Sequence, residues 1–143
     1  MAILSNFIYC INAERTDNGE GNDGNINAIG IMSAITPEFV PGTFSFSIIF
    51  TVLDVDTTKN NTVQVIFKQD SEENSLADTG IVTVPPMPDR NITGLPDEYK
   101  GMNMSMDLRN VIFESEGLYT TKVIFNGTEL GSKSIYVKGK RTQ

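Results

Sequence analysis

Residues 114–137 read ESEGLYTTKVIFNGTELGSKSIYV and decide the fold class. Apolar and polar residues alternate on both sides of Asn126-Gly127, and a two-residue period is that of a β-strand, whose successive side chains point to opposite faces. An Asn-Gly pair readily adopts the two positive-φ conformations of a type I′ turn, which suits antiparallel strands. The stretch therefore predicts a β-hairpin, with one face formed by Tyr119, Thr121, Val123 and Phe125.

The same alternation recurs along most of the chain, whereas helical periodicity is nearly absent. Its clearest instance is the stretch 43–54, where five apolar residues share one face: Phe44, Phe46, Ile48, Phe50 and Val52. Shorter strand patterns fall at 7–11, 25–35, 62–68, 80–84 and 102–113, separated by breaks rich in Gly, Asn and Pro. About eight short antiparallel strands without intervening helices predict an all-β protein, an antiparallel two-sheet sandwich.

The segment SEGLY at 115–119 resembles the tyrosine corner of immunoglobulin-like sandwiches. In that motif a tyrosine hydroxyl bonds to the backbone just before the next-to-last strand, and here two predicted strands follow Gly117. The resemblance implies an immunoglobulin-like arrangement with Tyr119 at the corner. The tryptophan and the paired cysteines of antibody domains are missing, because the chain has no tryptophan and a single cysteine.

A second resemblance covers more of the chain. A leading strand FIYCINAE, an Ile29-Gly30-Ile31 segment, Pro37, Pro41 and the Glu-Gly-Leu-Tyr stretch at 116–119 resemble a family of small uncharacterised bacterial and phage all-β proteins, a domain of unknown function. Where that family has a lysine in its first turn, this chain has the longer insertion NGEGNDGN. The resemblance implies the fold, and it implies no catalytic residues because the family has no assigned activity.

The 143 residues are predicted to form one domain, since folded domains commonly have about 100–150 residues. Within it, residues 85–101 form a long irregular loop that holds four of the six prolines, and residues 139–143 form a flexible tail. The net charge of −7 argues against direct nucleic-acid binding, which needs clustered cations. The basic residues Lys138, Lys140 and Arg141 are interpreted as a solubilising end.

No apolar run approaches the roughly 20 residues that span a bilayer, and the first residues do not form the basic start of a secretory signal. We therefore expect a cytoplasmic protein without a membrane partner. The single cysteine, Cys10, excludes an intramolecular disulfide, and its place in an apolar run predicts a small buried core residue.

The chain has no histidine, which excludes Ser-His-Asp and Cys-His catalysis and histidine-containing zinc sites. We expect no catalytic residues, no cofactor, no metal site and no enzymatic activity. The only Gly-x-Gly-x-x-Gly match, residues 19–24, lies in a polar turn with no helix after it. In the same loop, 16–25, the hard ligands Asp17, Glu20 and Asp23 leave calcium open as an alternative to a solvated turn, although the EF-hand spacing fails.

Long irregular loops inside compact domains are frequently functional, so the 85–101 loop is the candidate partner surface. The residues assigned to this surface are Met87, Asp89, Arg90, Asp97, Glu98, Tyr99 and Lys100. Directly after the loop, Met102, Met104 and Met106 alternate with polar residues. They are interpreted as core filling, with an adaptable binding surface as the alternative.

These observations favour a non-enzymatic protein-interaction module, a bacterial or phage accessory protein with an unidentified protein partner. One alternative is a phage or mobile-element inhibitor that blocks a host defence nuclease by acidic mimicry of nucleic acid. A second is a structural virion or surface component, which would be a homo-oligomer. A third is a calcium- or sugar-binding module.

Overall fold

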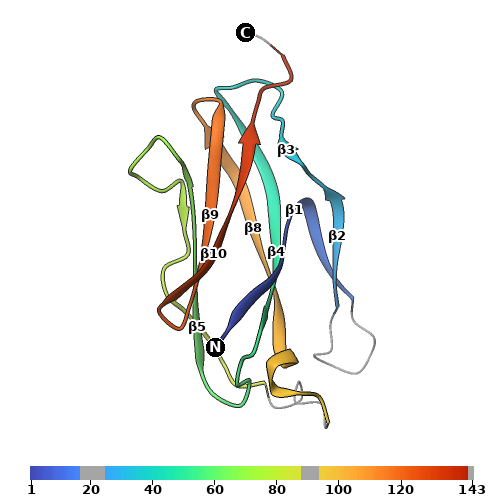
Figure 1. Ribbon diagram of the computed structural model, residues 1–143. Coiled ribbons are helices and arrows are strands. Elements are labelled where there is room, and N and C mark those ends of the chain that lie inside the picture. The colour runs from blue at the N-terminus through green and yellow to red at the C-terminus, as the bar shows by residue number, and fades with distance from the viewer. Residues whose placement is uncertain (17–24, 88–93, 142–143) are drawn as a thin grey trace.

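The structure, a computed structural model, describes residues 1–16, 25–87 and 94–141 (Figure 1). Its regular elements are β-strands and one short 3-10 helix. The strands are β1 (Ile3–Thr16), β2 (Asn25–Ile31), β3 (Ala34–Ile35), β4 (Gly42–Leu53), β5 (Asn61–Gln69), β6 (Ala77–Asp78), β7 (Val82–Val84), β8 (Gly101–Phe113), β9 (Gly117–Phe125) and β10 (Thr128–Val137), and the helix is η2 (Asp97–Tyr99). None of the described residues forms a helix long and apolar enough to cross a membrane.

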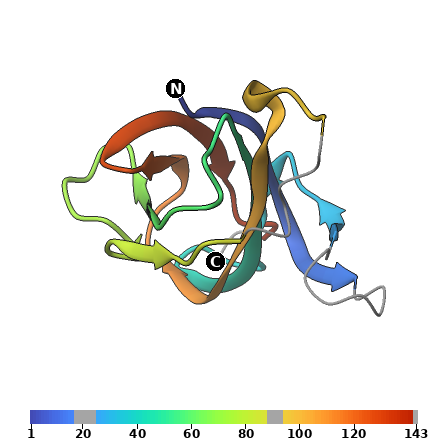
Figure 2. The same ribbon diagram turned by 90° about the horizontal axis from the view of Figure 1, so that it is seen from below.

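The strands form two sheets that pack face to face (Figure 2). The first sheet has the order β2-β1-β4-β8, and the second has the order β3-β10-β9-β5-β6, with β7 also paired to β5. Every pair is antiparallel except β3 with β10. The predicted two-sheet sandwich is confirmed. The described strands exceed the expected eight because β3 and β6 have two residues each, too few to show a period.

The end of the chain has the immunoglobulin-like arrangement that was predicted. The next-to-last strand, β9, lies between β10 and β5, and the hydroxyl of Tyr119 at its start donates a hydrogen bond of 2.7 Å to the carbonyl of Ser115. This is the tyrosine corner. At the hairpin that follows, Asn126 and Gly127 have φ angles of 50° and 81°, as the predicted type I′ turn requires.

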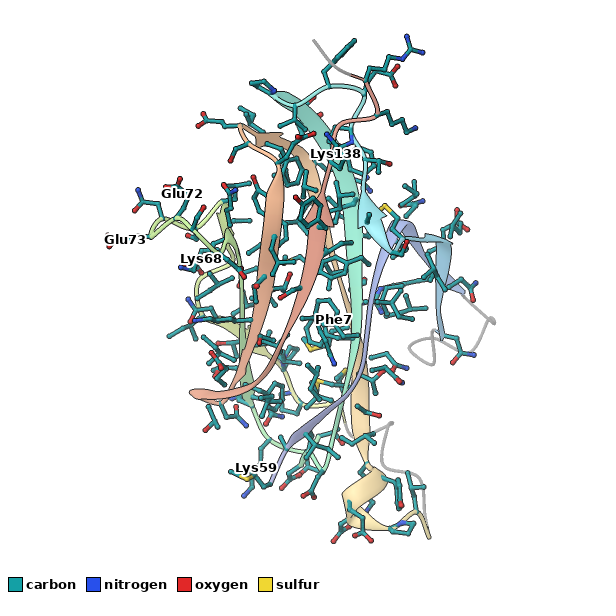
Figure 3. All side chains as sticks on the ribbon, turned by 45° about the horizontal axis from the view of Figure 1, so that its top comes forward. Phe7, Lys59, Lys68, Glu72, Glu73 and Lys138 are labelled. Atoms are coloured by element: carbon teal, nitrogen blue, oxygen red, sulfur yellow. The ribbon has the colours of Figure 1, made fainter. Side chains whose placement is uncertain are left out.

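Aromatic rings from both sheets fill the upper core. The ring of Phe67 on β5 lies 5.5 Å from that of Phe46 on β4 and 5.6 Å from that of Tyr119 on β9, between ring centroids. At the lower end Met102 is buried, and Met104 and Met106 pack against the core, which confirms the interpretation of these methionines as core filling. In Figure 3, Phe7 points among these side chains in the middle of the molecule.

Strand β1 serves two partners in succession. Residues 3–10 pair with β4, residues 10–16 pair with β2, and Cys10 pairs with both strands. The β1–β2 hairpin therefore leaves the body of the sandwich, as the end-on view in Figure 2 shows. Cys10 is a buried residue, as expected. It follows Tyr9 on the strand, so its side chain points to the other face of the first sheet, outside the core cluster that Tyr9 joins.

The chain after β10 is attached to the loop between β3 and β4. The backbone N–H groups of Lys140 and Arg141 donate to the carbonyls of Pro37 and Glu38, and the Arg141 guanidinium lies 2.7 Å from the Glu38 carboxylate. Residues 139–141 are thus docked, which differs from the flexible tail expected for 139–143. Residues 142–143 lie outside the described part.

Candidate functional site

The structure separates the residues that were predicted to form the partner surface. Asp89 and Arg90 lie outside the described residues. Met87 is half-buried against the core, and its N–H donates to the carbonyl of Thr57 at 2.7 Å. Asp97, Glu98 and Tyr99 are exposed together on η2, while Lys100 is half-buried. Within the described residues, the exposed part of the predicted surface is the tip 97–99.

Beside η2 lies a polar hollow of about 380 Å³, lined by residues 54–58, Asp97 and Lys100. Its charges are paired: the Lys100 ammonium lies 3.1 Å from Asp97, and the N-terminal ammonium lies 2.6 Å from Asp54. Hydrogen bonds from Thr58 hold the pKa of Asp56 below its usual value, so that carboxylate stays ionised. Among the described residues no group of His, Cys, Asp or Glu side chains could hold a metal ion. The calcium ligands considered above, Asp17, Glu20 and Asp23, lie outside the described residues.

Strand β8 is a common wall of four surface hollows that extend from η2 to the opposite end of the sandwich. The lower hollow of about 200 Å³ is lined by residues 101–103 and Tyr99, among others. The lower hollow of about 160 Å³ is lined by residues 102–105 and Met87, among others. The two upper hollows, of about 480 and 300 Å³, are lined by residues 106–112 and by Ile112 with residues 114–115. The candidate surface therefore follows β8 rather than the loop that precedes it.

The two upper hollows adjoin each other, because Leu76 and Ile112 line both. Together they are called the β8 groove here. The groove is lined by Gln69, Glu72, residues 74–79, residues 106–112, Glu114, Ser115 and Tyr119. On β8, seven consecutive residues line it. Side chains alternate between the two faces of a strand, so seven in a row line one hollow only where the edge of the strand faces it.

The edge of β8 that faces the groove has no strand partner among the described residues. β8 pairs with β4 from Gly101 to Phe113, and it is the last strand of its sheet. Between Phe44 and Phe46 the register shifts, and Asn110 on β8 has a φ of 53°, which marks a β-bulge in the groove wall. Such bulges are one means by which natural proteins limit uncontrolled pairing at a sheet edge.

Exposed apolar side chains lie where the two hollows meet. Ile112 is 59% exposed and Leu76 is 39% exposed, although both are large aliphatic residues. Next to them, Leu108 is buried and Met106 is half-buried. An apolar floor of this kind at a free sheet edge is typical of a surface that another chain covers.

Carboxylates dominate the charges of the groove. Four acidic residues line it, Glu72, Asp78, Asp107 and Glu114, against one basic residue, Arg109. The Arg109 guanidinium lies 3.6 Å from Asp107, whereas Glu72 and Glu114 have no ion-pair partner among the described residues. Hydrogen bonds from Gln64 and from the Gly80 N–H lower the pKa of Asp78, which keeps it ionised.

The residues of the groove were not found from the sequence. Its two walls, 69–79 and 106–115, are separated by about thirty residues and come from different sheets, so only the packing of the two sheets brings them together. A weak signal was present: the run DLRNVIF in 107–113 breaks strict alternation, and an isoleucine falls on the polar side. Without the fold this irregularity could equally mark a buried strand.

The perturbed titratable groups among the described residues each hold one protonation state near neutral pH. Burial raises the pKa of Tyr9 to about 12 and also raises the pKa of Cys10 and of Tyr119, so all three stay protonated near neutral pH. The Cys10 thiol donates to the Asn12 carbonyl at 3.3 Å. A hydrogen bond from Lys138 lowers the pKa of Glu116. Each of these shifts moves a group away from titration near pH 7, where acid–base catalysts operate.

The strand pairing and the tyrosine corner define the class of protein: an immunoglobulin-like β-sandwich in which β8 is one of the edge strands. The chain belongs to the family of unknown function DUF6941, whose model matches residues 15–138. This confirms the predicted membership of a family without an assigned activity. Among curated proteins, no match to the chain is found.

Among solved structures, the chain is similar to an immunoglobulin-like protein from Pseudomonas aeruginosa, with 12% identity and a TM-score of 0.40 over 96% of this chain and 97% of that one. It is also similar to a superoxide reductase (neelaredoxin) from Ignicoccus hospitalis, with 12% identity and a TM-score of 0.40 over 92% and 83%. For a beta-glucosidase from Listeria innocua the values are 10% and 0.42 over 78% of this chain and 16% of that one. Scores this low carry no argument, and the fold assignment follows from the strand pairing itself.

Proposed function

We propose that the chain is a non-enzymatic protein-interaction module that binds a partner protein along the free edge of β8. The observation that carries this proposal is that one strand, over residues 101–112, lines four surface hollows in succession. A free strand edge supplies backbone donors and acceptors to an extended segment of another protein, and side-chain pockets beside it supply selectivity. The core-packed body behind β8 holds this edge in place.

The chemistry of the titratable groups supports a binding role. The most perturbed groups are a tyrosine and a thiol that hold their protons, and carboxylates that lose theirs. A general acid or base works best with a pKa near the working pH. The exposed tip 97–99 of the predicted loop surface lies at the lower end of the same edge, and we place it at the margin of the binding surface.

Site-specific photo-crosslinking tests the proposal. Benzoylphenylalanine replaces one exposed side chain at a time: Ile112 on the β8 groove, Tyr99 on η2, or Tyr136 on β10. These side chains are matched in exposure, at 59, 60 and 52%. After irradiation in cells that produce the protein, we expect a discrete protein adduct from position 112, a weaker one from position 99, and none from position 136. An adduct from position 136 alone, or none from either other position, contradicts the proposal.

A second candidate is a phage or mobile-element inhibitor that imitates nucleic acid toward a basic nuclease. It is favoured by the net charge of −7 and by two adjacent glutamates, Glu72 and Glu73, which project from one side of the molecule with Lys68 nearby (Figure 3). A complex with a basic nuclease that weakens steeply between about 50 and 200 mM salt would support this function. A complex indifferent to salt would contradict it.

A further inference from the structure

We infer that the β8 groove receives an extended, basic segment of a partner protein in which cationic and apolar residues alternate, added as a strand to β8. This inference rests on the proposed function and names the chemistry of the partner. Three independent features of the groove carry it: the direction of its main chain, its apolar floor and the sign of its charge.

Within the described part of the chain, the backbone of β8 presents unpaired N–H and C=O groups to the groove. In an antiparallel sheet, each residue directs its N–H and its C=O to the same side, and successive residues alternate sides. About half of residues 106–112 therefore point their backbone groups into the groove, because β4 takes the other half. These groups can pair with an added strand, and about six or seven residues of a partner would span the seven residues of edge, one of which belongs to the bulge. A helix placed there would leave them unpaired.

The apolar floor of the groove determines the residues at every second position of the partner segment. Leu108 and Met106 lie at the inner side of the edge, with Leu76 at the junction of the two hollows, whereas Ile112 lies on the outer side of β8. Every second side chain of an added strand points to one face, so apolar residues at alternate positions would lie against this floor. On the outer side of β8, the aliphatic stems of the partner's cationic residues would cover part of Ile112, which is now 59% exposed, and this burial would contribute to the affinity.

The negative charge of the groove determines the residues at the remaining alternate positions of the partner segment. Glu72 and Glu114 rise beside the floor without ion-pair partners among the described residues, and both raise the pKa of the nearby Tyr119 hydroxyl through their negative charge. Asp78 and Asp107 stand on the two walls of the larger hollow. Four carboxylates against one guanidinium favour cationic side chains and repel an acidic segment, which gives selectivity as well as attraction.

A second copy of this chain is a poorer occupant by the same argument. Two copies joined through their β8 edges would bring Asp107, Glu114 and their counterparts together, and like charges placed face to face cost affinity. The net charge of −7 adds long-range repulsion. We therefore assign the groove to a partner of opposite charge.

The test uses the whole chain and fluorescein-labelled ten-residue peptides in fluorescence anisotropy. In one peptide Lys and Val alternate, in a second Glu and Val alternate, and in a third five Lys precede five Val. We expect the alternating Lys–Val peptide to bind at least tenfold more tightly than the other two and to weaken as salt is added. Equal binding of all three peptides, or no binding up to millimolar concentration, overturns the inference.

Two backbone-methylated forms of the Lys–Val peptide test strand addition directly. One carries N-methyl groups on every Lys and the other on every Val, so each loses its donors along one edge only. One form is expected to bind like the parent peptide and the other at least tenfold more weakly. Equal behaviour of the two forms, whether both bind or both fail, overturns strand addition.

Variants of the chain locate the peptide. Ile112→Ser is expected to weaken binding about tenfold, and its matched control Tyr136→Ser to leave it unchanged. The pair Glu72→Gln and Glu114→Gln together is expected to weaken binding five- to twentyfold and to flatten the salt dependence. Glu38→Gln with Glu129→Gln removes the same charge from two exposed positions that line none of the β8 hollows, and serves as its control. Equal effects of the test and control variants overturn the location.

Failure here is distinguishable from failure of the proposed function. If position 112 crosslinks to a protein while no Lys–Val peptide binds, only the partner chemistry is wrong. If sedimentation velocity shows a dimer that Ile112→Ser dissociates, a second copy occupies the groove and the inference is wrong. If neither position 112 nor position 99 crosslinks, the proposed function itself fails.

Discussion

The hydroxyl of Tyr9 on β1 lies 2.6 Å from the hydroxyl of Thr121 on β9, and this buried contact joins the two sheets. Tyr9 also donates to the carbonyl of Lys133 on β10 at 2.8 Å, so its single hydrogen is used there and Thr121 acts as the donor to Tyr9. The network satisfies a buried threonine hydroxyl and a carbonyl of β10 at the same time. This network of hydrogen bonds holds the first sheet, which includes β4 and β8, against the second sheet.

Replacing Tyr9 by Phe should lower the free energy of unfolding by about 1–3 kcal/mol, because the buried Thr121 hydroxyl and the Lys133 carbonyl lose their partner. Urea denaturation followed by circular dichroism measures the loss. Adding Thr121→Val to Tyr9→Phe should recover part of it, since removing both partners leaves fewer unsatisfied groups. A double variant less stable than the sum of the single variants would contradict this account of the network.

The same tyrosine predicts a loss of stability in alkali. Burial raises the pKa of Tyr9 to about 12, above the value near 10 of an unfolded tyrosine, so the folded state favours the protonated form. Its contribution is fully present below pH 10 and is lost as the pH rises through 12. The two-unit difference corresponds to about 2–3 kcal/mol. Urea midpoints from pH 8 to pH 12 should fall more steeply for the wild-type chain than for Tyr9→Phe; parallel slopes would contradict the assignment.

The tyrosine corner predicts a smaller effect. Tyr119→Phe removes the hydrogen bond to the Ser115 carbonyl and should cost about 1 kcal/mol in the free energy of unfolding. Tyr136→Phe, at a half-exposed site on β10, is the control and should change stability by less than about 0.5 kcal/mol. Thermal denaturation of the two variants side by side gives the comparison. Equal stability of the two would show that the corner is not a stabilising contact.

Two glycines predict different costs for the same substitution. A Cβ at Gly101, where β8 begins, would lie 2.0 Å from the carbonyl oxygen of Val52, so Gly101→Ala forces β8 away from β4 and should cost about 3 kcal/mol or more. At Gly127 a Cβ meets nothing within 4 Å, but φ is +81°, so Gly127→Ala should cost only about 1 kcal/mol of backbone strain. Chemical denaturation orders the two, and the reverse order would contradict the β4–β8 geometry.

The Cys10 thiol should react slowly with thiol reagents in the folded chain. The thiol is 0% exposed on the outer face of the first sheet, and burial raises its pKa, so the reactive thiolate is scarce and covered. At pH 8 a thiol-specific disulfide reagent should modify the native chain roughly a hundredfold or more slowly than the urea-unfolded chain. Rapid native labelling would show that the β1–β2 hairpin opens readily.

The hairpin at 117–137 and the long strand β4 could be predicted because each has one apolar face and one polar face, with turn residues at its ends. The departure of β1 from β4 after Cys10 could not, since no Gly or Pro marks it and it depends on two strands, β4 and β2, that pair with opposite edges of β1 over different residues. An edge strand and a central strand have the same alternation of apolar and polar residues when each has one buried face. The free edge of β8 therefore follows only from the strand order of the sheets. The predicted loop surface precedes β8 in the chain and stays a prediction, with its tip 97–99 beside the lower end of the candidate site.

The most direct test of the central claim, that the free edge of β8 receives another chain, is amide chemical-shift mapping of the ¹⁵N-labelled protein with the unlabelled Lys–Val peptide. The account predicts that the largest shifts fall on residues 106–112 and on the facing wall at 74–79, with little change at Leu118 and Tyr136. Largest shifts on β10, or shifts spread evenly over both sheets, would contradict it.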